Sequence, residues 1–141
     1  MFGSAYWSTY KRIEQEVLEL SHSICFDDNQ LEVYSNEILD LIVRICTNIE
    51  SLYEDIYRDE FSKTEPKIGP MIMKLSEMLF LEDKIICIAN DNFHFHKEMK
   101  EIKPFKYKYK NKDDFYSTYN ALKHNRSANI KKAKFTFFCV R

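Results

Sequence analysis

The sequence predicts an all-α fold, a single domain built as an up-down bundle of four to five helices. Two long segments carry apolar residues spaced alternately three and four positions apart, the pattern of a helix with one apolar face. Two glycines and three prolines in 141 residues are too few for a turn-rich β fold. Apolar residues make up 45 % and aromatic residues 15 %, so residues 1–141 can bury a core and are not a disordered chain.

The first two helices are predicted over residues 5–25 and from an N-cap at Ser35 to about Glu60. The first has its apolar positions at Tyr6, Tyr10, Ile13, Val17, Leu20 and Ile24. The second has them at Ile38, Leu41, Ile45, Ile49, Leu52 and Ile56. Acidic residues in the first turns of the second helix suit the positive end of the helix dipole. We expect the two helices to form an antiparallel pair.

The middle of the chain predicts a short third helix and an irregular insertion. Pro70 can be the first residue of the third helix, because a proline there loses no hydrogen bond. Residues 84–110 are expected to be loop-rich or to contain a short extended piece. The β-branched run at 84–88 favours extended backbone, but one strand needs a partner.

The last part of the chain predicts two more helices. Asn111 or Asp113 would cap the fourth, which turns Phe115, Tyr119 and Leu122 inward. The fifth would begin near Asn129 and carry an apolar line of Ile130, Ala133, Phe137 and Val140. The sequence stops at Arg141 without a capping glycine, so we expect this helix, and with it the domain, to be shortened at the C-terminus.

Charge is divided unevenly although the net charge is only −1. Residues 1–96 carry 8 Lys/Arg against 18 Asp/Glu, whereas residues 97–134 carry 12 against 4. A basic segment of this kind can bind a polyanion, or the two parts can dock within the chain or between subunits.

Aromatic residues alternate with histidines or lysines between residues 93 and 110. Phe93 and Phe95 flank His94, and three further aromatic residues alternate with Lys106, Lys108 and Lys110. Alternation with lysine is typical of a strand or of a surface that stacks nucleic-acid bases, which makes these lysines candidate RNA contacts. The alternative is that the aromatic residues pin the insertion to the helical core.

Several classes of site are disfavoured. The glycine-rich phosphate loops and the nucleophile elbow of serine hydrolases are absent, and two glycines could hardly build them. Cys87, His94 and His96 do not make up a four-ligand zinc set, so we expect neither metal nor cofactor. Scattered cysteines without close pairs and the lack of a long apolar run favour a cytoplasmic, non-membrane protein.

Residues 119–126 hold the most informative chemistry of the chain. Lys123, His124 and Arg126 can bind phosphate or move protons. On a helix, four polar residues would share one face, namely Asn120, Lys123, His124 and Ser127. The same pattern also fits a solvated surface or a histidine that merely packs. Glu50 is expected to be exposed beside the apolar face, and if it is buried it needs a partner such as His124 or Arg126.

These residues, together with the helix pattern, resemble the HEPN superfamily (higher eukaryotes and prokaryotes nucleotide-binding). The segments that carry the resemblance are VYSNEILDLIVRICTNIESLYEDIY, PFKYK and YNALKHNRSANIKKA. They are similar to a bacterial HEPN-like branch whose late helix reads roughly YNxxKHxR, and the resemblance runs from about Tyr10 to Ala133.

The resemblance implies a metal-independent endoribonuclease of a defence or toxin system. Its motif is an arginine, a polar residue and a histidine four to six positions later, and two subunits combine their motifs in one site. Asn120 matches the polar residue and His124 the histidine, but Tyr119 stands where the arginine is expected. Arg126 could replace it only from another angle.

The leading expectation is therefore an RNA-directed protein with His124 as general acid/base at a 2′-hydroxyl. Lys123 and Arg126 would neutralise the phosphate, Asn120 would orient the substrate or the imidazole, and Tyr119 would contact RNA. RNA, a second copy of the chain and a cognate antitoxin are the partners that the resemblance implies. The alternative is a non-catalytic interaction module that keeps the fold without the activity.

Overall fold

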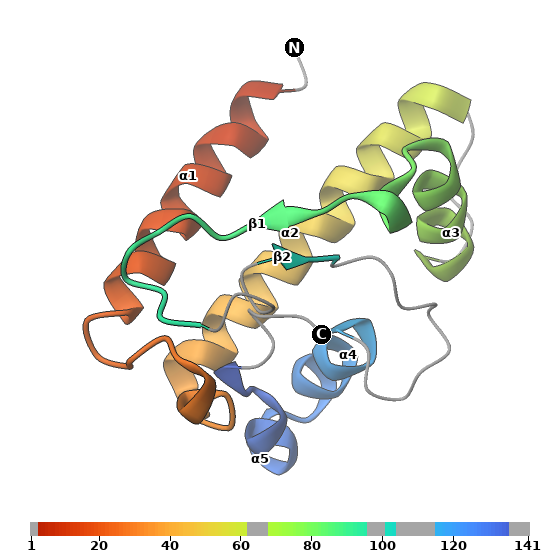
Figure 1. The fold of residues 1–141 in the computed structure, drawn as a ribbon. Helices are drawn as coiled ribbons and strands as arrows, with labels where there is room; N and C mark the ends of the chain where they lie inside the picture. Colours follow the sequence, from red (N-terminus) through yellow and green to blue (C-terminus); the bar gives the residue numbers. More distant parts are fainter. Residues whose placement is uncertain (1–2, 62–67, 96–100, 104–114, 136–141) are drawn as a thin grey trace.

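A computed structural model gives the fold and describes residues 3–61, 68–95, 101–103 and 115–135 (Figure 1). The α-helices are α1 (Gly3–Leu20), α2 (Asn36–Phe61), α3 (Ile68–Met78), α4 (Phe115–His124) and α5 (Arg126–Asn129). The short 3-10 helices of the described residues are η1 (Asp28–Gln30), η2 (Leu81–Asp83) and η4 (Ile130–Lys132). The strands β1 (Ile86–Cys87) and β2 (Glu101–Ile102) have two residues each. The all-α class is thus confirmed.

Helix α2 is the central element of the fold, because α1, α3 and α4 all pack against it. It begins as the sequence predicts, since the Ser35 side chain accepts a hydrogen bond of 3.1 Å from the Ile38 amide. Helix α1 runs in the opposite direction to α2 (Figure 1). The Tyr6 hydroxyl donates to Asp55, and Arg44 pairs with Glu16 at 2.6 Å, so polar contacts also join the two helices.

Helix α1 ends at Leu20, earlier than the predicted residue 25. The chain then turns, and the Ser23 and Ile24 amides both donate to the Leu20 carbonyl. Continued helix would carry Phe26 away from the core. The turn instead places Phe26 in full burial and in a bridge with Phe93.

The core has two parts, which lie along successive halves of α2. The first half of α2 packs with the end of α1, with α4 and with the chain around residues 93–95 and 133–135. The second half packs with α3 through Tyr53, Tyr57, Met71, Ile72 and Leu75. Helix α3 starts at Ile68, two residues before the predicted Pro70.

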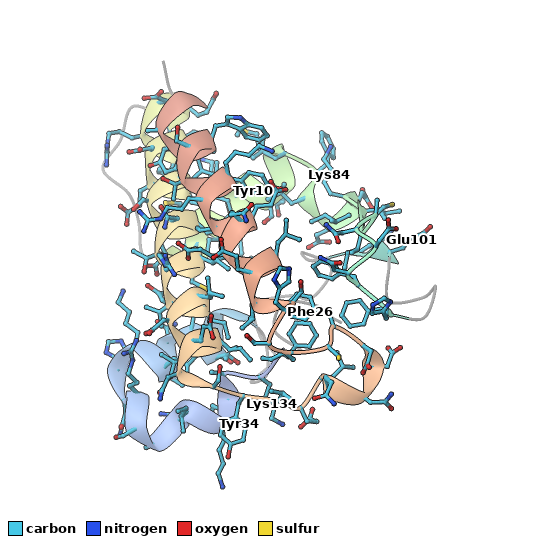
Figure 2. All side chains as sticks on the ribbon, turned by 90° about the vertical axis from the view of Figure 1, so that its left-hand side faces the viewer. Tyr10, Phe26, Tyr34, Lys84, Glu101 and Lys134 are labelled. Carbon is cyan, nitrogen blue, oxygen red and sulfur yellow. The ribbon has the colours of Figure 1, made fainter. Side chains whose placement is uncertain are left out.

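Four phenylalanines tie distant parts of the chain together in the first core. The Phe26 ring lies 4.8 Å from that of Phe93 and 4.3 Å from that of Phe135, measured between centroids, and the Phe95 and Phe135 rings are 5.9 Å apart. Phe26 sits at the centre of the side-chain view in Figure 2. Phe93 and Phe95 therefore pin the insertion to the core. The aromatic residues and lysines at 105–110 lie outside the described residues.

The predicted extended piece is β1, and its partner is β2. The two strands are antiparallel, with Ile86 opposite Ile102 and Cys87 opposite Glu101. They lie in front of α2 (Figure 1). Between α3 and β1, Phe80 adopts a left-handed backbone conformation (φ 51°) and is 69 % exposed.

The prediction of a fifth helix running through Ile130 and Ala133 is wrong for residues 130–135. Helix α5 has four residues, η4 has three, and the helix does not continue through Ala133. Lys134 forms an antiparallel bridge with Tyr34, and the two residues lie close together in Figure 2. The Phe135 amide donates to the Val33 carbonyl at 2.7 Å. This pairing carries Phe135 into the core. Phe137 and Val140 lie outside the described residues.

Replacing Phe26 by alanine should cost about 3–5 kcal/mol of unfolding free energy, because the ring is fully buried among other rings. The matched control is Phe80→Ala, the same substitution at an exposed side chain, which should change stability by less than about 1 kcal/mol. Urea unfolding followed by circular dichroism measures both. Equal costs would contradict the aromatic core described above.

Candidate functional site

Helix α4 ends at His124, inside the stretch that the sequence singles out. Asn125 has non-helical backbone angles (φ −147°, ψ 79°), and its side chain accepts from the Ala128 amide at 3.3 Å, which starts α5. The Asn129 amide group donates to the carbonyls of Ala121 and Asn125, so α5 is tied to the end of α4. The expectation that Ser127 continues one helical face with Lys123 is therefore wrong.

Tyr119 is a core residue. Its side chain is completely buried, and its hydroxyl donates to Glu50 Oε2 at 2.7 Å and lies 3.3 Å from Thr47 Oγ1. The expected inward orientation is confirmed. A buried ring with its hydroxyl engaged cannot stack on a base, so the expected RNA contact of Tyr119 does not fit this arrangement.

Glu50 is the acidic residue of α2 that contacts Tyr119 and Lys123 of α4. Only 19 % of its side chain is exposed, and its Oε2 atom lies 3.5 Å from Lys123 Nζ as well as accepting from Tyr119. The partners of this carboxylate thus include Tyr119 and Lys123. One turn earlier, burial raises the pKa of the Cys46 thiol to about 12, and the charge of Glu50 adds to this shift.

Lys123 is held above the core with its charge intact. Its ammonium lies 5.2 Å from the centre of the Tyr119 ring. A hydrogen bond with the Tyr119 hydroxyl raises the pKa of Lys123, and the charge of Glu50 raises it further, against an opposing effect of burial. Lys123 therefore stays protonated near neutral pH and can serve as a phosphate-binding charge, not as a general base.

Arg126 and His124 lie on the surface at the junction of α4 and α5. Arg126 forms an ion pair with Asp40, near the start of α2, through its Nη2 atom. His124 is exposed, and no hydrogen bond or ion pair holds its ring within the described parts of the chain. Asn120 is half-buried one turn before His124. Lys123, His124 and Arg126 are neighbours in the sequence, but the two cations pair with acids on different turns of α2, whereas His124 has no such partner among the described residues.

The charge asymmetry of the sequence reappears as ion pairs between distant segments. Residues 115–135 contain five Lys/Arg and no Asp/Glu. Three of these cations meet acids of residues 32–50, in the pairs Lys134–Glu32, Arg126–Asp40 and Lys123–Glu50. Lys131 and Lys132 are exposed and meet no acid among the described residues. Ion pairs within the chain thus involve three of the five cations, and Lys131 and Lys132 remain unpaired among the described residues.

Sequence reasoning missed the roles of Asp40, Asn125 and Asn129, and it expected Glu50 to be exposed, which is wrong. The signal for Asn125 and Asn129 was available, because asparagine is favoured at helix ends. For the two acids no local signal exists, since their partners among residues 119–126 are far away in the sequence.

Lys106, Lys108, Lys110 and His96 lie outside the described residues, so the structure does not place these candidates. His94 and Cys87 are exposed. Within the described ranges, no three His, Cys, Asp or Glu side chains gather as a metal site would require. In the same ranges, every helix is too short or too polar to cross a membrane.

Comparisons of this chain with protein-family models, with curated proteins and with solved structures find no match.

Tyr119→Phe should cost about 1.5–3 kcal/mol of unfolding free energy, because it removes the charge-assisted hydrogen bond that the buried hydroxyl donates to the carboxylate of Glu50. The control is Tyr10→Phe, which removes a hydroxyl bonded to Glu14 at an exposed position and should cost well under 1 kcal/mol. Denaturant unfolding of both variants checks the difference. If Tyr119→Phe is as mild as its control, Glu50 does not anchor α4.

Proposed function

We propose that this chain is a HEPN-like, RNA-directed protein that contacts RNA through the α4–α5–η4 surface. The observation that carries the proposal is the charge of this surface, which has four Lys/Arg and no acid of its own, and of these Lys131 and Lys132 meet no acid among the described residues. Lys131 and Lys132 face solvent there, and His124 and Arg126 lie nearby in the chain. Lysine and arginine bind RNA mainly through its phosphates.

The resemblance to HEPN ribonucleases extends the proposal to cleavage. His124 is the one imidazole of the α4–α5 surface, and an imidazole can take a proton from a ribose 2′-hydroxyl near neutral pH. Lys123 and Arg126 would stabilise the charge that grows on the scissile phosphate, and Asn120 would orient the substrate. This chemistry uses the side chains of the chain itself and calls for no metal.

A second candidate is a non-catalytic interaction module, and two observations favour it. The position of the motif arginine holds the buried Tyr119, and Lys123 and Arg126 are already paired with acids. Large apolar side chains are also exposed between the middle of α3 and β1, as an interaction surface would have them: Met73, Met78, Leu79, Phe80, Ile85 and Ile86.

Neutralising Lys131 and Lys132 together (Lys131→Gln, Lys132→Gln) should weaken RNA binding and flatten its salt dependence. For single-stranded RNA, each lysine that no longer neutralises a phosphate lowers the slope of log K against log salt by about 0.7. The control pair is Lys11→Gln with Lys84→Gln, two exposed lysines in other parts of the chain; Lys84 lies far from Lys134 in Figure 2. Fluorescence anisotropy with labelled single-stranded RNA across a salt series measures both. An equal weakening in the control would place RNA elsewhere.

Wild-type protein should cleave a mixed, labelled RNA in EDTA, and His124→Ala should lower the rate by about 100-fold or more, as expected when a general acid/base is removed. His22→Ala, at another exposed histidine, should keep the wild-type rate. Gel analysis of the products is the measurement. Cleavage that survives His124→Ala rules out the proposed catalytic role, and a folded wild type that binds RNA without cutting it supports the interaction module.

A further inference from the structure

The ion pair between Arg126 and Asp40 joins the proposed RNA surface to the central helix. Arg126 is the first residue of α5, and Asp40 lies in the second turn of α2. Both side chains remain largely exposed, at 58 % and 55 %. Asn125 and Asn129 hold the two ends of α5 through hydrogen bonds, so the backbone of Arg126 has a fixed position.

We propose that Asp40 is a built-in competitor of RNA, whose carboxylate occupies the guanidinium that a phosphate of bound RNA would take. This inference rests on the RNA-directed function proposed above and adds a regulatory contact to the same surface. A guanidinium binds a carboxylate and a phosphate through the same planar set of N–H donors. A phosphate can therefore replace Asp40 without a change in the fold.

The Arg126–Asp40 pair suits exchange better than the neighbouring pair of Lys123 and Glu50. Exposed ion pairs contribute little to stability, because both partners keep most of their water and are screened by salt. Glu50 is mostly buried and also holds the Tyr119 hydroxyl, so releasing it would disturb the core. Asp40 can leave Arg126, whereas Glu50 must stay.

Competition by Asp40 would make the affinity depend on how many phosphates the ligand offers. A single phosphate offers Arg126 only what Asp40 already supplies. An RNA strand that also reaches the exposed Lys131 and Lys132 adds interactions with which Asp40 does not compete. The surface would thus favour an extended polyanion over a mononucleotide.

Asp40→Asn tests this inference, because it keeps the size of the side chain and removes its charge. The matched control is Glu37→Gln, which makes the same change of net charge at an exposed acid three residues earlier. Asp40→Asn should bind single-stranded RNA about two- to fivefold more tightly than the control, the range that the strength of a surface ion pair allows. Its salt slope should be steeper by about 0.7, which corresponds to one more neutralised phosphate. In an Arg126→Gln background, Asp40→Asn should give no gain beyond that of Glu37→Gln.

The outcomes separate the inference from the proposed function. If RNA binds and both acid variants tighten it equally, the effect is one of net charge and Asp40 is not a competitor, while the RNA-directed function stands. A gain from Asp40→Asn that persists in the Arg126→Gln background also overturns the inference. If no variant binds RNA, including Asp40→Asn, in which Arg126 has lost its acid partner, both the inference and the proposed function are wrong.

Discussion

The contact of Glu50 with Tyr119 and Lys123 is the interaction on which the late part of the structure depends. A carboxylate that is mostly withdrawn from water needs partners, and here a buried phenol and an ammonium from one helix face supply them. Tyrosine also brings a ring that fills the core beside Leu122. This combination fixes the depth and rotation of α4 on α2, and with them the place where α4 ends and α5 begins.

From this anchor outward, the ion pairs between the two segments become progressively more exposed. Glu50 is mostly buried, and both Asp40 and Glu32 stand on the surface. The inner pair therefore contributes to the fold, and the outer pairs weaken more as salt is added, because salt screens exposed charges more strongly than buried ones. A basic segment can thus be held against an acidic helix and still offer cations to another polyanion.

The elements that follow from local pattern were predictable, and those that depend on distant contacts were not. The start of α2 at Ser35 and the inward side of α4 followed from capping and apolar spacing. The end of the fifth helix did not, because Phe135 is drawn into pairing with Val33 about a hundred residues earlier. The candidate residues 123–126 were found from their chemistry, but their acid partners on α2 could only be seen once the helices were packed.

Because Val33 pairs with Phe135, this part of the fold can form only after the late part of the chain has been synthesised. A ribosome adds about 5–20 residues per second, so roughly 5–20 seconds separate the synthesis of these two residues. During that interval Phe26 lacks the ring of Phe135 that covers it in the finished structure. The first core therefore forms late. Until then the growing chain exposes Phe26, and exposed apolar side chains of this kind bind chaperones and promote aggregation.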